Sequence, residues 1–256
     1  MYLQDIGILL ESIIFEGKKS NELKVCKENL NDLDFQMLTA DALYANKPML
    51  TSLIESNKDF LLTSKQKKLN AELVKQSELV ETIVKGSKVI NVFKVPKDFE
   101  VLTTYSNKYE YDYTAKPKYN KVIKVHTKAT YKTWNESGIK TMFTITSKEK
   151  DNTSPITRYY ITSLDSTTGA DRLESIARDR WSVENGLHRN KDMSFNEDKQ
   201  FTTKLSSIGL LSTLRNFVIS ILHINGYQAT TKTVRSLCNR EEVCLGILGQ
   251  RKLSRV

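Results

Sequence analysis

One stretch of the chain places ionisable residues at the spacing of a helix face. Arg180, Glu184 and His188 follow one another at intervals of four residues, so they would share one face of a helix. Lys191 or Asp192 would lie one turn further on. An acid between cations, beside an apolar stripe, is a candidate for catalysis, but the same spacing is common in exposed ladders of ion pairs. The spacing alone leaves both interpretations open.

Asp41 is a second candidate because of where it stands relative to a predicted strand. It follows the apolar run at 35–40 directly. In open α/β sheets, reactive groups gather at the carboxyl ends of the strands. An acid after a strand also serves as a helix cap or a loop residue, so this position too has two interpretations.

The segments around Asp41 predict the elements that would position it. The run at 35–40 reads as a strand, the sequence Asn46-Lys47-Pro48 as a helix start, and the run at 59–63 as a second strand. This order predicts a βαβ unit with two parallel strands. A longer helix is expected to follow over 69–83, because its apolar residues keep to one face.

A basic segment follows and differs in character. Lys85 to Lys132 holds eleven Lys and four acids, a net charge of +7 of the total +9, together with six Tyr. Its short alternating runs predict an all-β insertion. Basic solvated strands occur without nucleic acid, but lysines interleaved with aromatic residues favour contact with a DNA backbone. The candidate DNA-binding residues here are Lys121, Lys124 and Lys128.

The remainder of the chain reads as one strand followed by helices. A strand is expected at 158–164, and after the helix from Asp171 to about Asn190 an apolar helix at 207–224. Because that helix is apolar almost all round, it is expected to be buried on most sides. Asn225-Gly226 should end it. A short helix is expected at 232–239.

Composition sets the class of protein. The chain has 256 residues, 39 Lys+Arg, 30 Asp+Glu and 39% hydrophobic residues, which excludes a wholly disordered or collagen-like chain. No signal peptide or membrane span is expected, so we expect a cytoplasmic protein with no membrane partner. Three dispersed cysteines and three dispersed histidines favour neither a disulfide framework nor a zinc site.

Several segments together resemble one family. They resemble bacterial insertion-sequence transposases of the DDE type, in the branch that includes the H-repeat-associated proteins. The resemblance covers most of the chain from about residue 17, except the basic insertion. Its segments are 39–43 (Thr-Ala-Asp-Ala-Leu), 60–65 (Phe-Leu-Leu-Thr-Ser-Lys), 158–164 (Arg-Tyr-Tyr-Ile-Thr-Ser-Leu), 178–188 (Arg-Asp-Arg-Trp-Ser-Val-Glu-Asn-Gly-Leu-His) with its continuation to Asp198, and 211–216 (Leu-Ser-Thr-Leu-Arg-Asn).

The resemblance implies a ribonuclease H-like core, in which two Asp and one Glu hold two Mg²⁺ (or Mn²⁺) ions that cleave and join DNA. Asp41 matches the family's second Asp and Glu184 its Glu, so both are expected catalytic and metal-binding residues. The pattern Tyr-x2-Arg-x3-Glu-x6-Lys of related transposases is met except for its Tyr, where Ala177 stands. The residues implied to contact DNA in this signature are Arg178, Arg180, His188 and Lys191.

One part of the family pattern has no counterpart. The first Asp of the family stands in an Asp-Gly-Lys motif on the first core strand, and the chain contains no such motif. We therefore expect an α/β fold with an incomplete ribonuclease H-like core whose first strand is missing, leaving two open sheet edges. The expected parts are 1–84 and 151–256 for the core and 85–150 for the basic β insertion.

Two functions follow from this pattern. The first is a transposase polypeptide, truncated at its N-terminus, whose full-length relatives cut and join DNA while the chain itself has little activity. The alternative is a catalytically dead DNA-binding remnant or an inhibitor of the intact enzyme. The expected partner is DNA, as transposon ends and target, with no small-molecule substrate. The general mechanism of transposases also implies a homodimer, and the expected location is the bacterial nucleoid.

Overall fold

The computed structural model describes residues 2–3, 8–9, 19–112, 121–148, 154–181, 189–199 and 205–247. Among these, only the backbone is described for residues 2–3, 8–9, 19–21, 102–112, 121–132, 198 and 205. Contacts divide the chain into two compact units. One consists of Phe35–Leu173, and the other of Met1–Asp34 together with Glu174–Val256. The division falls within helix α4 (Ala170–Asp179).

The first unit begins with the predicted βαβ arrangement. Strand β3 (Met37–Ala40) and strand β4 (Asp59–Ser64) are parallel, and helix α2 (Lys47–Glu55) lies between them in the chain. Asn46 caps α2, because its side chain accepts a hydrogen bond from the backbone N–H of Met49 at 3.1 Å. The sequence prediction is confirmed for this part.

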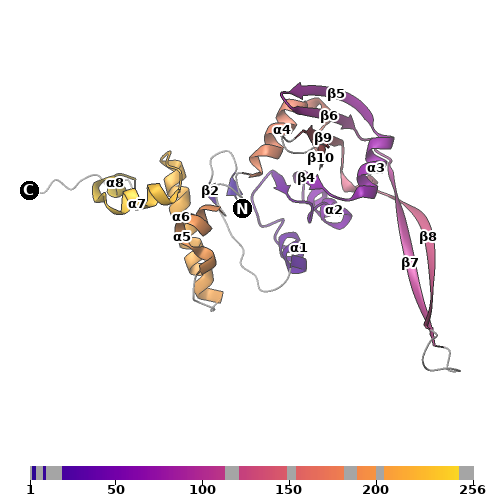
Figure 1. The fold of residues 1–256 in the computed structure, drawn as a ribbon, viewed down its shortest axis with the longest axis horizontal. Coiled ribbons are helices and arrows are strands. Elements are labelled where there is room, and N and C mark those ends of the chain that lie inside the picture. Colours follow the sequence, from indigo (N-terminus) through magenta and orange to yellow (C-terminus); the bar gives the residue numbers. More distant parts are fainter. Residues whose placement is uncertain are drawn as a thin grey trace, which may run out of the picture. The chain divides into compact units, whose positions relative to one another are not determined.

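Four more strands extend the same sheet. They are β5 (Glu78–Lys85), β6 (Lys88–Lys94), β9 (Thr141–Ser147) and β10 (Ile156–Thr162), which Figure 1 labels. The order across the sheet is β3-β4-β10-β9-β6-β5. Only β3 and β4 are parallel; the other neighbours are antiparallel. The predicted α/β class is confirmed. Within the described residues, β3 and β5 form the two edges of this sheet; that open edges result from a missing first strand stays a prediction.

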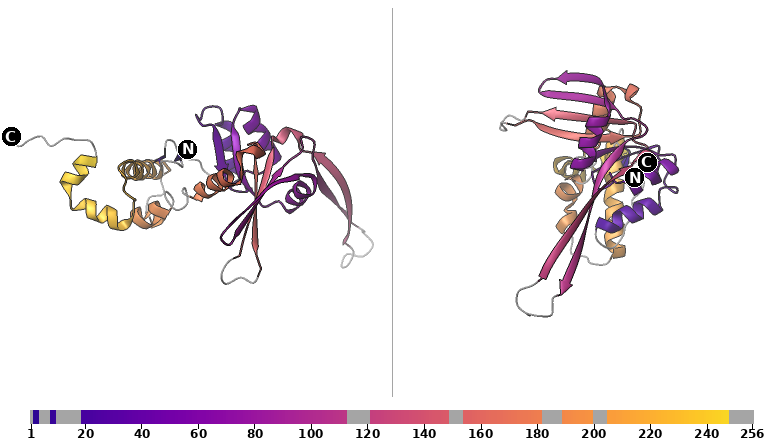
Figure 2. Two further views of the ribbon diagram at one scale, coloured as in Figure 1. Left: turned by 90° about the horizontal axis from the view of Figure 1, so that it is seen from above. Right: turned by 90° about the vertical axis from the view of Figure 1, so that its right-hand side faces the viewer.

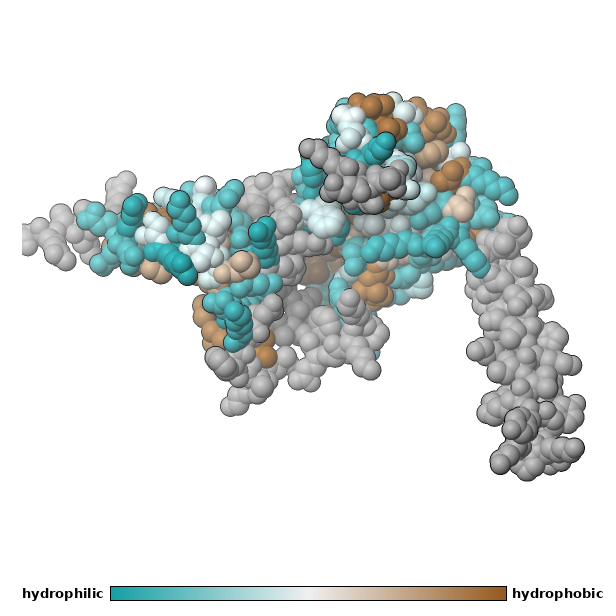
Figure 3. All heavy atoms as spheres, viewed as in Figure 1, coloured by the Kyte–Doolittle hydropathy of each residue, from teal (hydrophilic) through white to brown (hydrophobic). Residues whose placement is uncertain are grey.

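The core of this unit lies along the central strands and two helices. Phe60, Leu61 and Leu62 of β4 are fully buried, and Phe143 of β9 stacks on Tyr160 of β10 with ring centroids 4.7 Å apart. Leu50 and Leu53 of α2 and Leu69 and Leu73 of helix α3 (Lys67–Gln76) complete this core. Exposed hydrophobic residues instead lie over β5, where Figure 3 shows brown spheres.

One predicted helix is much shorter than expected. The prediction of a helix over 69–83 is wrong beyond residue 76, because α3 ends at Gln76 and β5 begins at Glu78. The segment after Ser77 is rich in β-branched residues, which favour strands. Gly86, with φ +58°, then closes a hairpin to β6, and glycine adopts this left-handed conformation at no steric cost.

A long two-stranded ribbon leaves this unit. Strands β7 (Glu100–Asp112) and β8 (Lys121–Thr133) pair with each other in a sheet of their own and reach away from the six-stranded sheet (Figures 1 and 2). At its base, the Gln76 side chain binds the backbone of Glu100, and Phe99 packs near Trp134. The basic insertion is therefore β-structured where it is described.

The expected insertion and the expected core share one sheet. Strand β9, from 85–150, pairs with β10, and β6 pairs with β9, so both belong to the same sheet as β3 and β4. We predict from the sequence that the basic insertion begins after residue 84 and ends at residue 150. These boundaries stay a prediction.

The second unit is helical in its C-terminal part. After α4 come helices α5 (Arg189–Phe195), α6 (Leu205–Ile224), α7 (Thr231–Cys238) and α8 (Glu241–Ile247), with a short 3₁₀ turn η4 (Glu197–Lys199). Helix α1 (Lys19–Glu28) and the small strands β1 (Tyr2–Leu3) and β2 (Ile8–Leu9) belong to it as well. Ile219, Leu222 and Ala229 form its buried cluster. The expected short helix at 232–239 is confirmed by α7.

Helix α6 confirms one expectation and contradicts another. It spans the predicted segment and ends before Asn225-Gly226, where Gly226 has φ +76°. It is not buried on most sides, because Leu210, Phe217 and Ile224 are each more than half exposed. By length and composition alone, Ser206–Ile224 could cross a membrane, and 28% of it is buried. An apolar sequence therefore did not imply a buried helix here.

Candidate functional site

Asp41 lies immediately after β3, at the carboxyl end of the parallel pair. Its side chain is exposed, and its Oδ1 accepts a hydrogen bond from the backbone N–H of Leu43 at 2.9 Å. The backbone carbonyl of Asp41 also accepts a bond from Tyr44, which closes a turn before α2. Both interpretations of this position hold geometrically: Asp41 shapes a loop, and it presents a carboxylate at the end of a strand.

The donor chemistry of Asp41 suits a divalent metal ion. Carboxylate oxygens are the ligands that Mg²⁺ prefers, and one hydrogen bond from a backbone N–H leaves further lone pairs on the carboxylate. No group of three or more His, Cys, Asp or Glu residues suited to a metal occurs within the described residues. A metal site on Asp41 would therefore need ligands from elsewhere in the chain or its surroundings.

The predicted partner, Glu184, lies outside the described residues, and so does His188. The described structure on either side is helical: α4 ends at Asp179 and α5 begins at Arg189. The expected continuous helix over 171–190 is confirmed only up to residue 179. The shared face of Arg180, Glu184 and His188 stays a prediction.

The two arginines before Glu184 are both described. Arg178 is exposed in the last turn of α4, where a cation also interacts favourably with the helix dipole. The Arg180 guanidinium lies over the Trp181 ring, 4.9 Å from its centroid. This is a cation–π contact, and 44% of the Trp181 surface is exposed.

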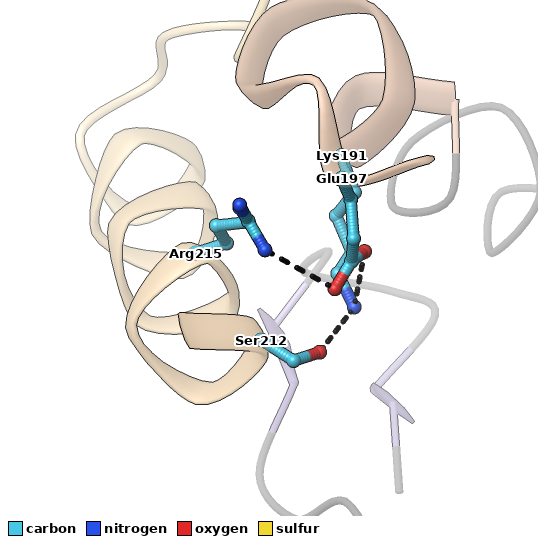
Figure 4. A network of polar contacts seen from close by, with 4 residues as sticks. All are labelled: Lys191, Glu197, Ser212 and Arg215. Atoms are coloured by element: carbon cyan, nitrogen blue, oxygen red, sulfur yellow. Dashed lines mark hydrogen bonds and ion pairs between the residues drawn. The ribbon is translucent and has the colours of Figure 1, made fainter. Parts of the chain in front are cut away.

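Lys191 is the predicted site residue with the most defined surroundings. Its ammonium lies 3.0 Å from a Glu197 carboxylate oxygen and donates a hydrogen bond to Ser212 Oγ at 2.8 Å (Figure 4). Arg215 approaches the other oxygen of Glu197 at 3.7 Å. All three charged side chains are at most 20% exposed. This network of Lys191, Glu197, Ser212 and Arg215 joins α5, η4 and α6.

Sequence reasoning placed Lys191 but missed its partners. Arg215 is the only Asp, Glu, Lys or Arg in α6, and a lone charge on an apolar helix is a signal for a buried partner. Glu197 gave no comparable signal, because Asp192 and Asp198 are also acids within seven residues of Lys191 in the chain.

Lys121, Lys124 and Lys128 lie on β8 of the ribbon, whose backbone register is defined. They belong to a different part of the first unit from Asp41. The predicted site residues that the structure describes therefore lie after β3 (Asp41), in or directly after α4 (Arg178 and Arg180), in α5 (Lys191) and in the ribbon.

Comparison with known proteins identifies the family. Residues 7–221 match the family model described as "Transposase DDE domain", which is most of the chain, so the chain belongs to this family. Two proteins of Escherichia coli strain K12 are similar to it: "Putative protein YbfL" and "H repeat-associated putative transposase YhhI". Each is 26% identical over 215 residues, covering 80% of this chain and 52% of the relative. The chain spans about half the length of these curated relatives.

The predicted resemblance to DDE-type transposases is confirmed. DDE transposases generally use divalent metal ions and act on DNA. Membership also suggests a soluble cytoplasmic protein, despite the apolar composition of α6.

Proposed function

We propose that the chain forms part of an insertion-sequence transposase that cuts DNA and joins it to a target, with Asp41 and Glu184 as two of its metal-binding residues. The observation that carries the proposal is the family match, which runs through both positions. The exposed carboxylate of Asp41 at the end of β3 supports it. The parallel pair β3–β4 around α2 is compatible with a ribonuclease H-like core.

Asp41 and Glu184 would hold Mg²⁺, or Mn²⁺ in its place. When bound, such ions activate the attacking hydroxyl group and stabilise the leaving oxygen of a phosphodiester. The Asp41 turn keeps the carboxylate in place, because Leu43 N–H fixes Oδ1.

Arg178, Arg180 and His188 would contact the DNA phosphates near the metal ions. A guanidinium forms a two-pronged hydrogen bond to a phosphate, and that of Arg180 lies over the Trp181 ring. Lys191 is less accessible to a phosphate, because its side chain is only 10% exposed and its ammonium already binds Glu197 and Ser212. We therefore assign the first DNA contacts to the arginines.

Metal-directed cleavage of the polypeptide tests whether the two carboxylates share an ion. Fe²⁺ substitutes for Mg²⁺, and with ascorbate and peroxide it produces radicals that cut the backbone close to the bound ion. The full chain should be cut near residue 41 and near residue 184, and Mg²⁺ in excess should suppress both cuts. Asp41→Asn should remove both cuts together.

The matched control is Asp32→Asn, another exposed aspartate, which should leave the cutting pattern unchanged. Cuts near only one of the two positions, or cuts near both that persist in Asp41→Asn, would contradict a shared ion. The readout is a fragment map, so it does not require the chain to be active as an enzyme.

A further inference from the structure

The register of the ribbon divides its residues between two faces. Alternate residues of a strand belong to the same face, and residues paired across two strands share a face. In the ribbon, Tyr105 pairs with Lys128, Asn107 with His126, and Asp112 with Lys121. Every residue of the ribbon can therefore be assigned to one face from the backbone alone.

The outer part of the ribbon has five cross-strand pairs on each face. We call the first set the lysine–tyrosine face. Its pairs are 103–130, 105–128, 107–126, 109–124 and 111–122. It holds Lys124, Lys128, His126 and three tyrosines (Tyr105, Tyr109 and Tyr111), and no acid.

The opposite face has a different charge balance. Its pairs are 104–129, 106–127, 108–125, 110–123 and 112–121. Lys108 and Lys121 are offset by Glu110 and Asp112, so its formal charge is 2 − 2 = 0, against +2 for the lysine–tyrosine face. The charge and all three tyrosines of these ten pairs are therefore concentrated on one side.

We propose that the lysine–tyrosine face binds a DNA strand, with Lys124 and Lys128 at the phosphates and the tyrosines against unpaired bases. Lysine neutralises phosphates without regard to sequence, and aromatic side chains on a β surface stack on the flat faces of bases. The inference rests on the proposed function, which makes DNA the substrate. Lys121, predicted from the sequence as a DNA-binding residue, lies on the opposite face, and we propose that this face does not bind DNA.

The positions have a spacing that suits an extended ligand. Two tyrosine–lysine pairs, 105–128 and 109–124, recur after four residues along the ribbon. At roughly 3.4 Å per residue they stand about 14 Å apart. A strand of DNA laid along the ribbon would therefore meet a cation and an aromatic residue twice.

Two double variants test the asymmetry with equal changes in net charge. Lys124→Gln with Lys128→Gln removes two charges from the lysine–tyrosine face, and Lys108→Gln with Lys121→Gln removes two from the other. Fluorescence anisotropy of the full chain with labelled DNA, over a salt series, gives the affinity. The first variant should bind about tenfold more weakly or worse, and its salt dependence should be shallower by roughly 1.8 on duplex and 1.4 on single-stranded DNA. The second should remain near wild type.

A third variant tests the tyrosines. Tyr105→Leu with Tyr109→Leu should weaken binding to single-stranded DNA by about tenfold and leave duplex binding unchanged, because paired bases offer no free face for stacking. Equal losses in the two lysine variants, or an equal loss on both DNAs in the tyrosine variant, would overturn the assignment. An unchanged melting temperature in each variant shows that folding is retained.

The experiment separates this inference from the proposed function. A wild-type chain that binds neither duplex nor single-stranded DNA at low salt would contradict DNA as the substrate. A wild-type chain that binds DNA while all three variants bind equally well would overturn only the role of the ribbon.

Discussion

Asp41 and Lys191 have opposite surroundings although both come from the same family signature. Asp41 is exposed and makes one local hydrogen bond, which any carboxylate after a strand could make. Lys191 is nearly buried, with an acid and a hydroxyl as partners. At the scale of the residue, the spacing of a motif indicates the type of side chain that is needed, but the burial of that side chain depends on residues distant in the chain.

A thiol in helix α1 gives a prediction about pH dependence. Burial, together with the nearby Glu22, raises the pKa of the Cys26 thiol. Because only the thiolate reacts with iodoacetamide, a raised pKa means less reactive thiolate at a given pH. At pH 8, Cys26 should be alkylated more slowly than the exposed Cys238, and its rate should go on rising at higher pH.

Mass spectrometry of peptides after timed alkylation measures both rates in one sample. In urea the rates should converge, because the burial of Cys26 is lost. Preferential alkylation of Cys26 in the folded chain would show that its surroundings are not as described.

At the scale of the element, the Lys191 network connects three segments through charge. Lys191 comes from α5, Glu197 from η4, and Ser212 and Arg215 from α6. Two cations share one carboxylate, that of Glu197. Loss of Glu197 would leave two positive charges facing each other in a poorly solvated place.

Glu197→Gln should therefore destabilise the chain by about 2–4 kcal/mol, slightly less than the loss of a partner in a fully buried pair. Adding Lys191→Met should recover part of that loss, because one unpaired cation is removed. Urea unfolding followed by circular dichroism measures both changes.

The exposed pair of Lys24 and Glu28 provides the control, since its two side chains are 74% and 60% exposed. Lys24→Gln should cost no more than about 0.5 kcal/mol. If Glu197→Gln cost as little, the network would not hold the three segments together.

The sequence predicted elements best where signals were local. Asn46 and Pro48 marked the start of α2, and Asn225-Gly226 the end of α6, because caps and turns depend on a few neighbouring residues. The strand β5 was mistaken for helix, since Leu79, Val80 and Ile83 are compatible with either period until a pairing partner is known. The pairing of β4 with β10 has no local signal at all.

At the scale of the whole molecule, the metal site that the family needs has one carboxylate for which the sequence shows no matching motif. The resemblance implies two Asp and one Glu, and no Asp-Gly-Lys motif occurs among the 256 residues. The polypeptide of this sequence alone should therefore show little or no Mg²⁺-dependent nicking or strand transfer on DNA. Conversion of supercoiled plasmid to nicked circles, with a chelator as the blank, measures this directly.

Robust nicking that Glu184→Gln abolishes would show that another group of this chain replaces the missing carboxylate. Nicking that Glu184→Gln leaves unchanged would point to a contaminating nuclease, and the assay would be repeated after further purification.

The sheet order also determines when parts of the chain can fold during synthesis. Strand β4 pairs with β10 on one side, and Tyr160 stands opposite Thr63, 160 − 63 = 97 residues later. At about 5–20 residues per second, the ribosome needs roughly 5–20 s to supply that partner. Throughout this time Phe60, Leu61 and Leu62 form an apolar strand with an open edge, which is a template for aggregation. Chaperones that bind nascent chains should recognise residues 59–64 first, and slower growth at low temperature should raise the yield of soluble protein.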